Sequence, residues 1–140
     1  MKNFHKLLLT SALTVAPLAA SAQTANISTT TLSTAGVDVT TTPQNASGNT
    51  YFANDGSTFI LIKNGNGTPV TATLITQQTA IQAQGYGTIP LADVTVGVPS
   101  ATTLLIGPFP TSRWNTTQGT VRVSMSTVTN VSATSIKVPR

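Results

Sequence analysis

The stretch that decides the fold is TFILIKNGNGTPVTATLIT, residues 58–76. Its first part is a nearly continuous apolar run of strand length, which is typical of a central strand buried on both faces of a sheet. The Asn-Gly-Asn-Gly segment at residues 64–67 favours a tight turn, because Asn and Gly both tolerate positive φ. Residues 70–76 then alternate apolar side chains with threonines. The stretch therefore predicts a β-hairpin over residues 58–76.

Alternating segments of strand length recur along the rest of the chain. They lie at residues 93–98, 102–106, 121–125 and 128–138. In the last segment the apolar residues switch from odd to even positions, and so from one face of the strand to the other. A β-bulge near Thr134 or Ser135 would explain this switch. Short strands at regular spacing predict an all-β fold, an antiparallel β-sandwich or jelly-roll-like single domain with its body at residues 50–140.

The segment before this body is rich in Thr and Ser. Residues 23–49 predict a flexible N-terminal arm that also contains a first short strand, in which Val37 and Val39 alternate with polar residues.

The few charges of the body are scattered. Arg122 and Lys137 lie within predicted strands, where we expect them to discourage pairing between sheet edges. Five scattered cations beyond residue 22 do not form the clustered positive stripe that nucleic-acid binding requires.

Residues 1–22 have the pattern of a secretory signal peptide. Lys2 and Lys6 precede an apolar stretch, and Ala20-Ser21-Ala22 supplies the small residues of a cleavage site. The predicted cut lies between Ala22 and Gln23. No later apolar run is long enough to span a bilayer, so we expect a secreted, periplasmic or cell-surface product if this leader is functional.

The residue types that carry most side-chain chemistry are nearly missing after the expected leader. Residues 23–140 contain no His, Cys or Glu, and their acids are Asp38, Asp55 and Asp93. Most side-chain catalysis uses these residue types, so we expect no enzyme, no cofactor and no disulfide. Asp55 lies between Asn54 and Gly56 like a fragment of a calcium loop, but no acidic neighbours follow it. We therefore expect a turn there and no metal site.

One stretch, IGPFPTSRWN at residues 106–115, gathers prolines, aromatic residues and an arginine. Phe109, Arg113 and Trp114 are candidate protein-interface residues, because Arg and Trp are enriched at binding hot spots. The alternative, which we favour, is a rigid loop in which Trp114 caps the end of the core and Arg113 stacks on it or is solvated. We likewise expect the Tyr51-Phe52 pair and Tyr86 to fill the core at strand ends.

Five pieces of the body resemble small β-rich proteins of tailed bacteriophages. They lie at residues 56–65, 69–73, 107–110, 113–115 and 131–138. The resemblance extends over roughly residues 35–138. Such proteins are typically encoded near the major capsid gene, and some decorate or cement the head. The resemblance implies a non-enzymatic virion structural protein that binds a capsid lattice in repeated copies, and it implies no particular site residue.

Three functions follow from these observations. The body favours a capsid decoration or virion surface module whose partner is a protein lattice. The leader favours an exported bacterial surface or extracellular-assembly subunit that pairs with copies of itself by strand addition, as a homo-oligomer. A third hypothesis is a carbohydrate-binding module with Trp114, Tyr51 and Tyr86 as sugar platforms.

Overall fold

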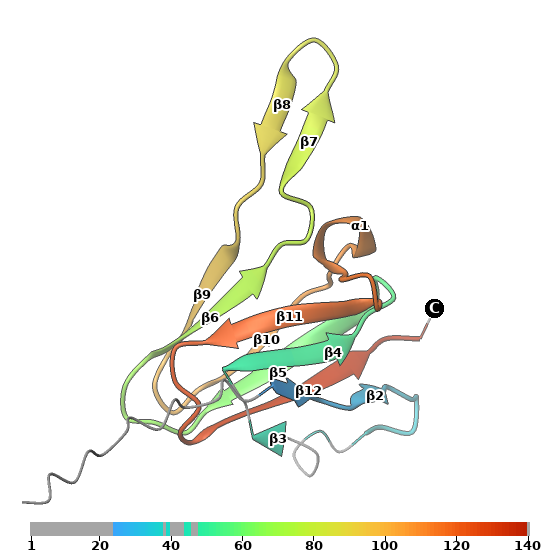
Figure 1. Ribbon diagram of the computed structural model, residues 1–140. Coiled ribbons are helices and arrows are strands. Elements are labelled where there is room, and N and C mark those ends of the chain that lie inside the picture. Colours follow the sequence, from blue (N-terminus) through green and yellow to red (C-terminus); the bar gives the residue numbers. More distant parts are fainter. Residues whose placement is uncertain (1–23, 38, 40–43, 46–47, 140) are drawn as a thin grey trace, which may run out of the picture.

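The chain folds into two β-sheets packed face to face, from which a small hairpin projects (Figure 1). The structure is a computed structural model and describes residues 24–37, 39, 44–45 and 48–139. The expected leader and part of the expected arm lie outside the described residues. No helix among the described residues has the length and hydropathy needed to cross a membrane.

Each main sheet has five strands. The first sheet has the order β1 (Thr24–Asn26), β4 (Asn49–Ala53), β11 (Thr120–Met125), β6 (Val70–Ile75) and β9 (Val94–Val98). The second has the order β10 (Thr103–Ile106), β5 (Thr58–Asn64), β12 (Val131–Lys137) and β2 (Thr29–Thr31), and β3 (Gln44–Asn45) also pairs with β12. The projecting hairpin consists of β7 (Ala80–Ala83) and β8 (Gly87–Pro90), and the described helix is α1 (Thr111–Trp114). The predicted all-β sandwich is confirmed.

The core forms because strand residues alternate between an inward and an outward face. In β11, for example, Val121, Val123 and Met125 are buried, whereas the residues between them are half-buried. Phe52 of β4 is also buried, as expected for a core residue. Its ring makes an edge-to-face contact with Phe109 at a centroid distance of 5.4 Å. The inward faces of both sheets therefore share one apolar core.

The predicted hairpin over residues 58–76 is wrong, because β5 and β6 belong to different sheets. β5 pairs with β10 and β12, while β6 pairs with β9 and β11. The two strands and the reversal between them are present. The connection, however, passes from one sheet to the other, so that the inward residues of the two strands face a common core.

β5 is central in its sheet, but it is not fully buried on both faces. Ile60 and Ile62 point into the core and are buried, whereas Phe59 and Leu61 on the other face are half-buried and Lys63 is exposed. The continuous apolar run therefore reflects one face in the core and a second, partly covered face.

The expected bulge in the last strand is absent. β12 pairs with β5 residue for residue, from Val131 opposite Asn64 to Lys137 opposite Thr58. The parity change instead arises because both faces of β12 are covered near its end: Ser135 faces the core beside Ile60, and Ile136 on the opposite face is also buried.

The described start of the expected arm contributes to both sheets. β1 pairs with β4 and β2 pairs with β12, and these are the two parallel pairings of the sandwich. Ile27, between the two strands, is buried in the core. The expected strand at Val37 and Val39 is wrong, since both residues lie outside the strands. Two alternating valines that follow a turn at Gly36 (φ 87°) are too short a signal to define a strand.

The expected role of Arg122 and Lys137 at sheet edges is also wrong. Arg122 lies on β11 and Lys137 on β12, and each of these strands has paired neighbours on both sides. The strands at the ends of the two orders are β1, β9, β10 and β2. Strand order depends on pairings between distant segments, which charge placement along the chain does not encode.

Candidate functional site

The candidate interface residues Phe109, Arg113 and Trp114 lie at one end of the core. Phe109 and Trp114 are 2% and 7% exposed, and their rings meet edge to face at 6.1 Å. The Arg113 guanidinium carbon lies 4.6 Å from the centroid of the Trp114 ring. This geometry matches the rigid-loop alternative. A direct interface role for the three residues stays a prediction, in which only half-buried Arg113 offers an accessible surface.

Arg113 also holds the segments that lead into and out of the hairpin. Its backbone carbonyl accepts hydrogen bonds from the N–H groups of Gln77 and Gln78, at 2.8 and 3.1 Å. Its Nη2 atom donates to the carbonyl of Ala92 at 3.2 Å. Nearby, the backbone N–H of Thr76 donates to an Asp93 carboxylate oxygen at 2.8 Å. The base of the hairpin is therefore fixed to the sandwich from both sides.

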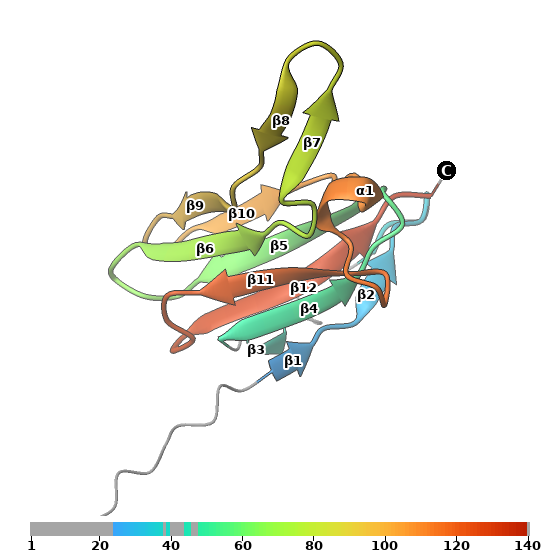
Figure 2. The same cartoon turned by 45° about the horizontal axis from the view of Figure 1, so that its top comes forward.

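The hairpin itself extends away from the sandwich (Figures 1 and 2). Ile81 and Ile89 lie opposite each other across its two strands and are 38% and 42% exposed. Gln82 Nε2 donates to Thr88 Oγ1 at 2.7 Å on the same hairpin. Residues 80–90 include no charged residue. The hairpin thus carries uncharged, partly apolar surface away from the core.

Tyr86 lies in the turn of this hairpin and is 87% exposed, so the expectation that it fills the core is wrong. Gly85 and Gly87 flank it with φ of 84° and 78°, a conformation that favours glycine. This Gly-Tyr-Gly turn between two short alternating segments is the signal that would have predicted the hairpin. The two strands of the hairpin are too short and too polar for their apolar alternation alone to have predicted them.

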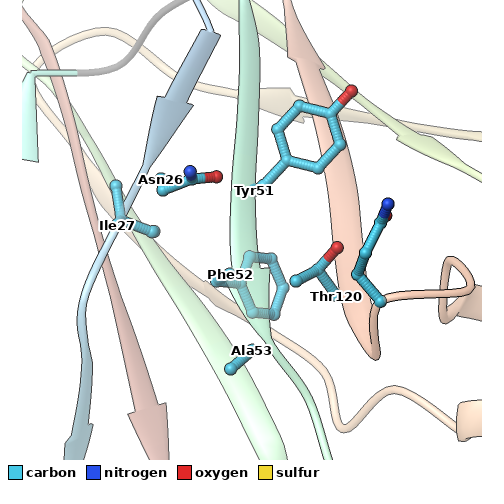
Figure 3. A pocket seen from close by; sticks show the side chains of 7 residues that line it. Asn26, Ile27, Tyr51, Phe52, Ala53 and Thr120 are labelled. Atoms are coloured by element: carbon cyan, nitrogen blue, oxygen red, sulfur yellow. The ribbon is translucent and has the colours of Figure 1, made fainter.

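A concave region of about 540 Å³, here called the outer pocket, lies at the end of the first sheet (Figure 3). It is lined by Asn26, Ile27, Tyr51, Phe52, Ala53, Gln118 and Thr120. Tyr51 is half-buried and lies on the outward face of β4, because the inward position is taken by its neighbour Phe52. Of the Tyr51-Phe52 pair, only Phe52 is a core residue as expected.

Charged residues of both sheets form polar contacts with their neighbours. Arg122, opposite Tyr51 in the sheet, donates from Nε and Nη2 to Asn49 Oδ1 at 3.0 and 2.8 Å. Asp55 forms an ion pair with Lys137 at 2.7 Å. The Lys137 hydrogen bond, with those from Ser57, holds the pKa of Asp55 well below its usual value.

Asp55 lies in a turn, as expected, since its Oδ1 accepts hydrogen bonds from the N–H and hydroxyl of Ser57 at 3.1 and 2.7 Å. Within the part of the chain that the structure describes, no three His, Cys, Asp or Glu residues come together as metal ligands. Two surfaces of the described residues are candidate functional sites, the projecting hairpin and the outer pocket.

Comparison with protein-family models, with curated proteins and with solved structures finds no match to this chain.

Proposed function

We propose that this protein is a non-enzymatic structural module that docks on a protein lattice through its projecting hairpin, as a capsid decoration or virion surface protein does. The observation that carries the proposal is Tyr86, which is 87% exposed at the end of an uncharged hairpin. A large aromatic side chain held away from the body by a paired scaffold gains its contacts from a partner. Tyr is also one of the residues enriched at binding hot spots.

The construction of the hairpin supports this role. Ile81 and Ile89 form an exposed apolar pair on the two strands that the Tyr86 turn connects. Such exposed apolar surface is typical of interaction sites. Arg113 and Asp93 anchor the base, so less conformational entropy is lost when a partner orders the hairpin. A rigid body with an anchored projection suits repeated, identical contacts on a lattice.

The test uses the full chain and capsids purified from its native source, with co-sedimentation as the measurement. The wild-type chain should sediment with the capsids. The triple variant Ile81→Ser, Tyr86→Ser and Ile89→Ser should remain in the supernatant at the same concentrations, while keeping the wild-type denaturation midpoint.

The matched control replaces apolar residues of similar exposure elsewhere, Val128→Ser and Val138→Ser. This variant should sediment as the wild type does. A native source without capsids, a wild-type chain that stays in the supernatant, or equal sedimentation of the triple variant would each contradict the proposal.

A second candidate function is an exported subunit that polymerises by strand addition. The observation that favours it is the pair of edge strands β9 and β10, which follow each other in the chain and contain no charged residue. An uncharged free edge is a template for pairing with another chain. Leu105 of β10 is also 53% exposed.

This candidate predicts concentration-dependent assembly that Leu105→Lys abolishes, measured by sedimentation velocity and electron microscopy. Mass spectrometry of the native protein should then find a start at Gln23 in the periplasm or medium. An intact Met1 in purified capsids would favour the first function and exclude this one.

A further inference from the structure

We propose that the outer pocket is a binding site for a neutral oligosaccharide, with Tyr51 as the platform on which one sugar ring stacks. This site lies on the first sheet and is independent of the hairpin, so it goes beyond the proposed docking function. It also involves a different set of residues from Tyr86 and Trp114, because Tyr86 stands alone in a turn and Trp114 is buried.

The shape of the pocket suits one or two sugar rings. Its volume of about 540 Å³ falls within the range typical of small-molecule sites. Figure 3 shows Tyr51, Phe52 and Ala53 in succession along β4, with Asn26 of β1 on one side of this strand and Thr120 of β11 on the other. Asn26 is opposite Tyr51 in the sheet register, and Thr120 is opposite Ala53. An aromatic ring beside polar side chains is the arrangement that a pyranose needs, since its C–H face is apolar and its edges carry hydroxyls.

The polar groups around the pocket are available to a ligand. The side-chain amides of Asn26 and Gln118 and the hydroxyl of Tyr51 make no hydrogen bond with another described residue. Asn26 and Gln118 are exposed, so their side-chain amides are hydrated until a ligand displaces the water. Each amide offers both a donor and an acceptor, which allows it to bind adjacent sugar hydroxyls.

The charge of the pocket argues for a neutral ligand. Its lining holds no Lys, Arg, Asp or Glu. The nearest cation in the sheet register, Arg122 opposite Tyr51, directs two of its donors to Asn49. A phosphate-rich chain such as a nucleic acid would need a cluster of positive charge here, and a carboxylated sugar would need a free cation. A neutral hexose or pentose polymer needs neither.

The test is a titration of the full chain, labelled with ¹⁵N, with cello-, chito-, malto-, laminari-, xylo- and manno-oligosaccharides. At about 5 mM sugar, appropriate to a shallow site with millimolar affinity, at least one of them should shift the amide signals of Asn26, Tyr51, Gln118 and Thr120. Tyr51→Ala and, separately, Gln118→Ala should weaken that binding about tenfold.

Tyr86→Ala is the matched control, because it removes an exposed tyrosine outside the pocket. It should bind the same sugar with unchanged affinity, and the emission of buried Trp114 should confirm that each variant is folded. The proposal is overturned if no sugar of the panel binds, if Tyr51→Ala binds as the wild type does, or if binding is lost in Tyr86→Ala. The capsid test of the hairpin is unaffected by any of these results.

Discussion

Asn64 determines, at the scale of a single residue, how the chain leaves one sheet and enters the other. Its buried Nδ2 donates to the carbonyls of Thr68, Val98 and Pro99 at distances of 2.9 to 3.1 Å. Its Oδ1 accepts a hydrogen bond from the N–H of Asn66 at 2.9 Å. Backbone groups of two connections are therefore satisfied by one amide, in a place where water does not reach it.

Replacing Asn64 with Ala should destabilise the fold by about 2–4 kcal/mol, because it leaves buried backbone groups without partners. Urea denaturation of the wild type and the variant measures the difference. Asn66→Ala serves as the control, because Asn66 is half-buried and its Nδ2 makes a single hydrogen bond, to Thr129. It should cost about 1 kcal/mol or less. Equal losses in the two variants would contradict this account of Asn64.

At the scale of elements, the β5–β6 connection passes close to the β11–β12 connection. The N–H of Gly65 donates to the carbonyl of Asn130 at 2.8 Å. A Cβ atom on Gly65 would lie 2.9 Å from that oxygen, closer than side-chain carbons come to backbone oxygens. Gly67, two residues later, has open space around its Cβ position. Of the two glycines of the predicted turn, only Gly65 is therefore required by its surroundings to lack a side chain.

The variant Gly65→Ala should therefore lose about 1–3 kcal/mol of stability, since the connection must shift away from Asn130. Gly67→Ala should change stability by less than about 1 kcal/mol, and in the favourable direction if the unfolded chain loses freedom. Thermal denaturation of the pair measures both. The explanation fails if Gly67→Ala is the more damaging of the two.

At the scale of the whole molecule, the core is a single unit that the first and last described strands help to close. β1 joins the first sheet and β2 joins the second, where it pairs with the C-terminal strand β12. Trp114, the one tryptophan of the sequence, is buried against Phe109 at the end of this core. Loss of either sheet would expose the same apolar surface, so the sandwich should unfold cooperatively.

Unfolding followed by Trp114 emission and by far-ultraviolet circular dichroism should therefore give one transition with the same midpoint. The native emission should be blue-shifted and should move to longer wavelength on unfolding, because the indole leaves the core. The triple serine variant of the hairpin should keep this midpoint, since the hairpin strands pair only with each other. Separate transitions for the two probes would show that the sheets unfold independently.

The candidate sites were less predictable from the sequence than the fold. The sequence analysis singled out residues 106–115, because two prolines and the only tryptophan stand out in a Thr-rich chain, and their role at an interface stays a prediction. The sequence did not predict that Arg113 forms hydrogen bonds with the base of the hairpin, because its partners Gln77, Gln78 and Ala92 are distant from it in the chain. Tyr86 was misassigned to the core for a similar reason: an aromatic residue near a strand end is usually covered, and only the surrounding fold leaves it exposed.

The sequence by itself determined the strands β5, β6, β9, β10, β11 and β12 and, in β11 and β6, which side chains point inward, because alternation is a local property of the extended backbone. The tertiary structure alone decided that β5 pairs with β10 and β12, that β6 lies in the other sheet, and that both faces of β12 are covered near its end. The physical reason is that the N–H and C=O groups along any strand edge are chemically alike. Which strands pair with each other is therefore decided by the total apolar surface that the whole core buries, and not by the residues next to a turn.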